Sequence, residues 1–258
     1  MWRIFWRIFK TAALAVLALV TLFVVYEVFT FPRVSELRTE NPETTSMIET
    51  RLKEARDEGR APRRVQQWVP LERISVNLQR AVLAGEDTNF ATHHGFDYEA
   101  IQRAWEEGSK ISEKEAQQEG DTDPSDWIPD LSKFKRGGST ISQQLAKNLY
   151  LSSERTAARK VKEAAITYFL ERSLSKCRIL EIYLNVIEWG DGVYGAEAAS
   201  QTYFHKPAAS LSPQEAAFLS AMIPSPLNVF NPQKNLRRVQ RRQRVILRGM
   251  NAVKLPAC

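Results

Sequence analysis

The chain has 258 residues, of which 43% are hydrophobic and 26% charged, enough for one large globular domain or two small ones. The formal net charge is +6 and the pI is near 9.3, which indicates an anionic partner such as nucleic acid, a membrane surface or a phosphorylated substrate. The two cysteines, Cys177 and Cys258, form no CxxC pair. Their spacing argues against a disulfide framework or a zinc site, and we expect two free thiols.

The first 31 residues predict a membrane anchor. Residues 11–31 hold a single charged residue, Glu27, and as a helix would span about 30 Å, the thickness of a bilayer's hydrocarbon core. Basic residues interleaved with aromatics precede this segment, which places residues 1–10 in the cytoplasm as a short tail and the rest of the chain outside. A cleaved signal peptide and a buried core helix are the alternatives, but no small-x-small cleavage site follows the segment.

The next segments predict a stalk and a domain. Residues 32–65 are polar, charged and interrupted by prolines, and we expect a stalk that contains a short polar helix over 47–60. The domain is then expected over 66–258. Within it, residues 106–126 are strongly acidic and poor in large apolar side chains, so we expect a mobile surface insertion there.

Two adjacent carboxylates, Glu86 and Asp87, follow a helical stretch over residues 76–84. The C-terminus of a helix carries partial negative charge, so the ionised form of a carboxyl group is disfavoured there. An environment of this kind moves the carboxyl pKa toward working pH, as a general base requires. The alternative is that these acids only solvate a loop.

A basic, glycine-rich loop leads into a predicted helix over residues 141–150. Thr140 and Gln143 fit a capping box at its start. Thr140, Gln144 and Lys147 recur at helical spacing and form a polar stripe beside an apolar one. The N-terminus of a helix after such a loop favours a phosphate or another anion, although the spacing is not that of a Walker A loop. An ordinary capped surface helix is the alternative.

The remaining segments predict further helices. Arg159 and Glu163 are neighbours at i and i+4, and a surface ion pair is the alternative to a site. Ser175 begins a strongly apolar helix that we expect to be buried at the centre of the domain. A capping box with proline at its first helical position starts the helix after Ser212. Residues 234–248 form a basic amphipathic helix, suited to anionic lipid, to nucleic acid or to a solvated face.

Four long motifs follow one another along the chain: EDTNFATHHGFD, RGGSTISQQLAKNLY, RKVKEAAITYFLE and RILEIYLNVIEWGDGVYGAEAAS. Together they resemble the peptidoglycan glycosyltransferases, glycosyltransferase family 51, over about residues 70–230. No SxxK-type transpeptidase module follows, so the resemblance is to the monofunctional branch of that family.

The resemblance implies a mainly α fold, with a lysozyme-like helical domain, a smaller membrane-proximal jaw lobe and one preceding transmembrane helix. The jaw would fall at residues 106–134, where this sequence is longer than the family pattern. The implied reaction polymerises lipid II into glycan strands for the cell wall. The donor MurNAc C1 is transferred with inversion to the acceptor GlcNAc 4-hydroxyl, and undecaprenyl diphosphate leaves.

The resemblance also implies roles for residues. Glu86 matches the family's catalytic base and Glu163 its second essential glutamate. The other matches are expected near the substrate and its diphosphate: Asp87, Phe90, His93, Arg136, Ser139, Thr140, Gln144, Lys147 and Arg159. No tightly bound cofactor and no certain metal ligand are expected, with Mg²⁺ or Mn²⁺ at the diphosphate as an option.

The implied setting is the inner membrane of a bacterium, with the catalytic domain on the periplasmic face. Expected partners are lipid II, the growing glycan chain and membrane lipids, with transpeptidases and other cell-wall synthesis proteins as candidates and no nucleic acid. Two rival functions remain. A muramidase would use Glu86 as general acid but leaves the glycine-rich basic stretch without a use. An anchored scaffold would need neither glutamate.

Overall fold

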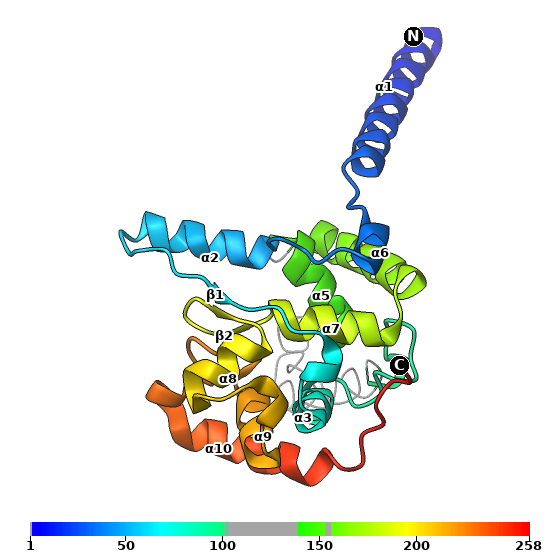
Figure 1. Ribbon diagram of the computed structural model, residues 1–258. Helices are drawn as coiled ribbons and strands as arrows, with labels where there is room; N and C mark the ends of the chain where they lie inside the picture. The colour runs from blue at the N-terminus through cyan, green and yellow to red at the C-terminus, as the bar shows by residue number, and fades with distance from the viewer. Residues whose placement is uncertain (1, 101, 103–138, 153–155) are drawn as a thin grey trace, which may run out of the picture. The chain divides into compact units, whose positions relative to one another are not determined.

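The computed structural model describes residues 2–100, 102, 139–152 and 156–258 (Figure 1). Contacts divide the chain into two compact units, Met1–Arg33 and Val34–Cys258. The expected jaw at 106–134, its acidic segment included, lies outside the described residues, as does Arg136.

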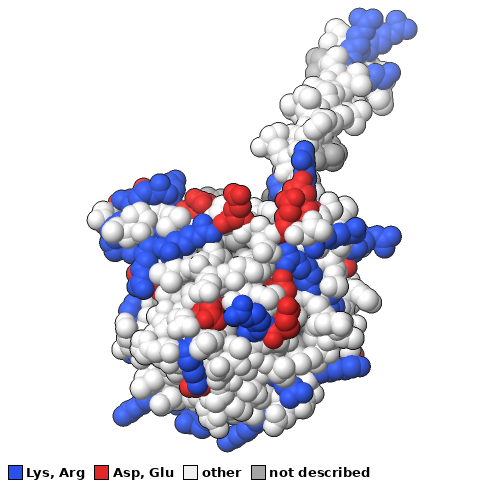
Figure 2. Space-filling model, viewed as in Figure 1, with Lys and Arg blue, Asp and Glu red and all other residues white. Residues whose placement is uncertain are grey.

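The first unit is one helix, α1 (Trp2–Phe29). Its large apolar side chains are exposed, among them Leu14, Leu17 and Leu22, and basic side chains gather at its N-terminal end (Figure 2). Within the part of the chain that the structure describes, no helix has both the length and the apolar character needed to cross a membrane.

The segment expected to be a stalk is part of the second unit. It forms a 3₁₀ turn η1 (Val34–Arg38), the helix α2 (Ser46–Asp57) and the strand β1 (Val65–Gln66). Ile48 on α2 is fully buried and Leu37 on η1 nearly so. A few apolar residues spaced among charges are enough to pack these elements onto the domain, which therefore begins near residue 34. The expected short polar helix is confirmed as α2.

The helices of the second unit begin where polar side chains accept the first free backbone N–H groups. Ser75 caps α3 (Val76–Glu86), Ser175 caps α7 (Lys176–Val186), and Ser212 forms the predicted capping box at α9 (Pro213–Met222). The other elements are α5 (Ile141–Tyr150), α6 (Ala157–Ser173), α8 (Ala196–Phe204), α10 (Pro232–Gly249), and the 3₁₀ turns η2 (Leu71–Arg73) and η4 (Ala208–Ser210).

The core forms around α7, as its apolar density predicts. Ile182, Tyr183 and Leu184 are fully buried. On one side α7 packs against α5 and α6, and α3 packs against α9 and α10 (Figure 1). The mainly helical fold class is thereby confirmed.

A small sheet covers one end of α7 and was not predicted. Its strands β1, β2 (Glu188–Gly190) and β3 (Val193–Tyr194) lie in the order β1-β3-β2, with β1 parallel and β2 antiparallel to β3. Gly192 makes the turn between β2 and β3 at φ +66°, where a Cβ atom would meet the Arg63 carbonyl oxygen at 2.7 Å.

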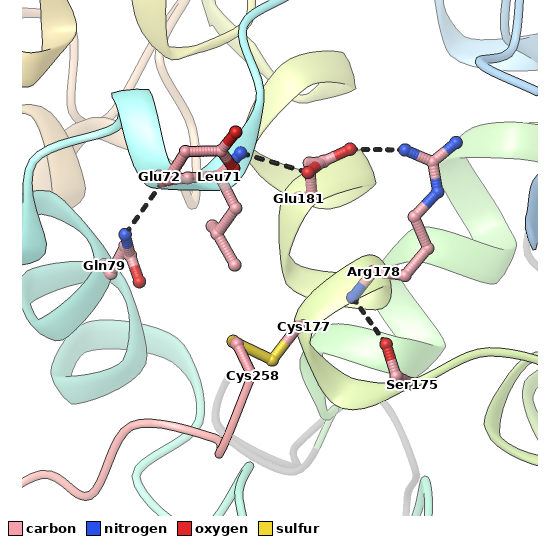
Figure 3. A pocket seen from close by; sticks show the side chains of 8 residues that line it. All are labelled: Leu71, Glu72, Gln79, Ser175, Cys177, Arg178, Glu181 and Cys258. Carbon is pink, nitrogen blue, oxygen red and sulfur yellow. Dashed lines mark hydrogen bonds and ion pairs between the residues drawn. A yellow bond between two sulfur atoms is a disulfide. The ribbon is translucent and has the colours of Figure 1, made fainter. Parts of the chain in front are cut away.

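Cys177 and Cys258 are joined by a disulfide, so the expectation of two free thiols is wrong. The two residues are 81 positions apart, and only the fold brings the C-terminal tail back to the start of α7 (Figure 3). The bond encloses α8, α9 and α10 in one covalent loop. A pocket of about 380 Å³ lies beside it, between the disulfide, η2 and the first turn of α7.

We expect Cys258→Ser to lower the free energy of unfolding by about 2–5 kcal/mol, because a long loop closed by a disulfide restricts the unfolded chain. Urea denaturation of the oxidised protein measures the change. The double variant Cys177→Ser/Cys258→Ser should match the single one and should not respond to reductant. Equal midpoints for the wild type and Cys258→Ser would contradict the prediction.

Candidate active site

Glu86 ends α3 with its side chain in a buried polar network. Its Oε2 accepts a hydrogen bond from Gln144 Nε2 at 2.9 Å, and its Oε1 accepts one from Arg242 Nη2 at 2.8 Å. Burial raises the pKa of Glu86, while Arg242, Gln144 and Lys147 act in the opposite direction. The direction of this shift agrees with the sequence interpretation, but its main cause is burial and not the helix terminus. A carboxylate so placed is suited to general-base chemistry.

Gln144 connects Glu86 to the core. The hydroxyl of Tyr183 donates to Gln144 Oε1 at 2.8 Å, and the tyrosine is fully buried on α7. The predicted polar stripe of α5 therefore places Gln144 directly against the candidate base. Ser139 is exposed just before this helix, and its carbonyl oxygen lies 3.5 Å from Gln144 Nε2.

Lys147 lies one turn further along α5, within electrostatic reach of both expected glutamates. Burial lowers the pKa of Lys147, Glu163 and Glu86 raise it, and Arg159 lowers it. Among the described residues, none forms an ion pair with Lys147. An ammonium group in this position is available to an anionic ligand.

Glu163 is the second candidate carboxylate, and it is nearly fully buried on α6. Its Oε2 pairs with Arg159 Nη1 at 2.9 Å, and its Oε1 pairs with Lys160. The buried Nε of Arg159 has no hydrogen-bond partner among the described residues. A buried N–H group of this kind needs an acceptor, so Arg159 is also available to an anion.

Asp87 was expected to contact substrate, but the structure uses it to hold the fold. Its Oδ2 accepts from the backbone N–H of Ile141 at 2.9 Å, and His93 Nε2 lies 2.9 and 3.0 Å from its two oxygens. The N–H of Gly95 donates to His93 Nδ1, so Nε2 is the nitrogen that donates to Asp87. The anion bound at the N-terminus of α5 is therefore the Asp87 carboxylate.

Thr140 and Phe90 are likewise occupied within the protein. Thr140 is buried, closes the predicted capping box with Gln143 and donates its hydroxyl to the Gly95 carbonyl at 2.7 Å. Phe90 is fully buried beneath the ammonium group of Lys176, 4.5 Å from the ring centroid. The family resemblance placed these residues near the substrate because they belong to the same motifs as Glu86 and Gln144.

Arg242 is a site residue that the sequence analysis missed. It lies on α10, which was expected to be solvated or to bind anionic lipid or nucleic acid, and it is 156 positions from Glu86. Its Nη2 also donates to the Gly85 carbonyl at 2.7 Å. Helical spacing was the signal in the sequence that could have placed Arg242 on the inner face of α10. Arg242 lies three residues after Val239 and four before Ile246, and both of these are buried.

The expectation of Mg²⁺ or Mn²⁺ at the substrate diphosphate stays a prediction. In the ranges that the structure describes, no group of three or more His, Cys, Asp and Glu residues could hold a metal ion. Glu86 and Glu163 each face a cationic side chain already.

Asp87→Ala is expected to destabilise the protein by about 1–3 kcal/mol for each buried donor that it leaves unpaired, on His93 and on Ile141. Thermal unfolding and denaturant titration measure the loss. Asp191→Ala is the matched control, because Asp191 is exposed and its contact with Arg60 is 3.7 Å long. If the two variants unfold alike, Asp87 does not hold the loop to α5.

Comparison with known proteins identifies the family. The sequence profile of the transglycosylase family matches residues 53–122 and 128–251. A biosynthetic peptidoglycan transglycosylase from Laribacter hongkongensis is 43% identical over 244 residues, or 93% of this chain and 96% of that protein. A protein of the same name from Nitrosospira multiformis is 40% identical over 98% of this chain and 98% of its own length. Another from Dechloromonas aromatica is 42% identical over 94% of this chain and 96% of its own length. The resemblance in the motifs is thus confirmed, and the chain belongs to the transglycosylase family.

Proposed function

We propose that this enzyme polymerises lipid II into linear glycan strands. The donor MurNAc C1 is transferred to the acceptor GlcNAc 4-hydroxyl with inversion, and undecaprenyl diphosphate is released. The observation that carries the proposal is that a buried carboxyl group with a raised pKa, Glu86, lies near a separate set of cationic side chains, Lys147 and Arg159. The names of the three relatives support the same reaction.

Glu86 takes the proton from the acceptor hydroxyl as the oxygen attacks the donor carbon. Arg242 and Gln144 each donate to one oxygen of the carboxylate, so the group keeps one orientation while a free lone pair accepts the proton. Burial favours the uncharged form of Glu86 and so raises its affinity for that proton.

The departing diphosphate needs neutralisation of charge more than it needs a proton. Lys147 supplies positive charge, and Arg159 supplies its Nε, a donor with no partner among the described residues. Both lie in a partly buried setting, where such interactions are stronger than in water. Glu163 holds Arg159 at 2.9 Å and, by raising the pKa of Lys147, favours its charged form. Glu163 is thereby a positioning residue for the cations.

The membrane setting is part of the proposal. An exposed apolar helix, α1, with basic residues at its N-terminal end favours attachment to the inner membrane with the N-terminus in the cytoplasm. Exposed arginines also line α10, at the edge of the second unit (Figure 2). Both features favour a surface of anionic lipid, where a lipid-linked substrate would be met.

A muramidase is the rival function, because a raised carboxyl pKa also suits a general acid. The cations at Lys147 and Arg159 favour the transferase, since hydrolysis of glycan releases no phosphate.

The test uses purified full-length protein in detergent with labelled lipid II. Products are separated on a gel before and after digestion with a muramidase. We expect a ladder that the muramidase removes. Cleavage of finished glycan without a ladder would favour the hydrolase, and binding of lipid II without reaction would favour the scaffold.

A further inference from the structure

We propose that Tyr183 is a positioning residue for the base, and that its buried hydroxyl fixes the amide of Gln144 so that Gln144 always presents an N–H to Glu86. The inference deepens the proposed function and rests on it, because it takes Glu86 as the base. Nothing in the sequence motifs or in the relatives' names assigns this role.

The direction of each hydrogen bond follows from the chemistry of the groups. An ionised carboxylate only accepts, so Gln144 must turn its Nε2 toward Glu86, at 2.9 Å. Its Oε1 then faces the core and needs a donor, which the Tyr183 hydroxyl supplies at 2.8 Å. Tyr183 keeps this proton, because burial and the nearby Glu86 and Asp87 carboxylates raise its pKa well above the usual value.

The chain of donors from Tyr183 through Gln144 to Glu86 favours the ionised base. Each donated bond polarises the next, and a donor to a carboxylate stabilises its charged form. Without the hydroxyl, Gln144 Oε1 would be a buried acceptor with no donor, and the amide could rotate to relieve this cost. The N–H to Glu86 would then be weakened or lost, and the pKa of Glu86 would rise further.

Other groups that face Glu86 stay in place when Tyr183 is changed. Arg242 on α10 and Lys147 on α5 both favour its charged form. Asp87, the next residue in the chain, accepts from the backbone N–H of Ile141 at the start of α5. A shift that follows loss of the Tyr183 hydroxyl therefore reports the amide and not these charges.

The experiment is the pH dependence of kcat/KM for lipid II polymerisation by Tyr183→Phe and wild type. We expect the acidic limb of the Tyr183→Phe profile to lie about half to one pH unit higher than that of the wild type. At pH values below the limb, kcat/KM should fall by roughly 3- to 10-fold, and at pH values above it kcat/KM should change little. A merely structural role would lower the rate equally at every pH. Tyr194→Phe is the matched control, since the buried Tyr194 hydroxyl has no hydrogen-bond partner among the described residues. Its profile should not move.

A second arm keeps the proposal testable if Tyr183→Phe unfolds, which thermal melting would reveal. Gln144→Met removes the amide N–H that donates to Glu86, and it should move the acidic limb in the same direction. Tyr183→Phe should add nothing in the Gln144→Met background. An unmoved limb in the folded Tyr183→Phe protein, or in Gln144→Met, overturns the inference. A wild type that forms no ladder overturns the proposed function instead.

Discussion

Glu86→Gln should lower the rate of glycan polymerisation by about 100- to 10,000-fold, the usual contribution of a general base. The amide has nearly the same shape and still accepts from Arg242, but it cannot take a proton from the acceptor hydroxyl. The lipid II ladder assay at saturating substrate measures the loss. A variant that polymerises at the wild-type rate would show that Glu86 is not the base.

The loss should be one of chemistry and not of folding. The pKa of Glu86 in the folded protein is raised, so its protonated form is favoured there. The shifted pKa of Glu86 contributes to the free energy of unfolding. This contribution is complete below the ordinary carboxyl pKa and is lost as pH rises through the raised pKa. Relative to the wild type, Glu86→Gln should therefore lose less stability at pH 7–8 than at pH 4.

Glu188→Gln is the matched control for this variant. Glu188 is also buried, its pKa is also raised by burial, and it also pairs with an arginine, Arg51, at 3.1 Å. It lies on β2, outside the network around Glu86. Polymerisation by Glu188→Gln should stay within a few-fold of the wild type, and a loss as large as that of Glu86→Gln would indicate a general effect of removing a buried charge.

Signals that act within one helical turn were readable from the sequence. The caps at Thr140, Ser175 and Ser212 are formed as predicted, because each depends on a hydroxyl and a backbone N–H three residues away. The placement of Gln144 and Lys147 beside the candidate base also follows from helical spacing once the family resemblance supplies the partner helix.

Features that depend on distant segments were not readable. Glu86 and Asp87 are adjacent and chemically alike, yet one is the candidate base and the other binds the N-terminus of α5, 54 residues away from it. Arg242 and the bond between Cys177 and Cys258 are likewise set by where α10 and the C-terminal tail return. Such pairings leave no periodic trace, because the chain between them has no fixed length or pattern.

Glu163→Gln should lower kcat/KM for lipid II by about 100-fold, because the side chains that receive the diphosphate lose the group that holds them. Arg159 would have a neutral amide in place of its ionic partner at 2.9 Å on α6, and its donors would be fixed less firmly toward the leaving group. Burial lowers the pKa of Lys147, and the negative charge of Glu163 is the strongest of the effects that raise it. Without it that pKa falls further, so Lys147 loses its proton at a lower pH.

The pH profile separates this role from a loss of packing. The alkaline limb of kcat/KM should move toward neutral pH in Glu163→Gln, in addition to the fall in rate. Glu171→Gln is the matched control on the same helix, where a buried carboxylate pairs with Lys176 at 2.7 Å. Its alkaline limb should coincide with that of the wild type. An unmoved limb in Glu163→Gln would mean that Glu163 does not govern the charge of Lys147, and that the diphosphate is received by other groups.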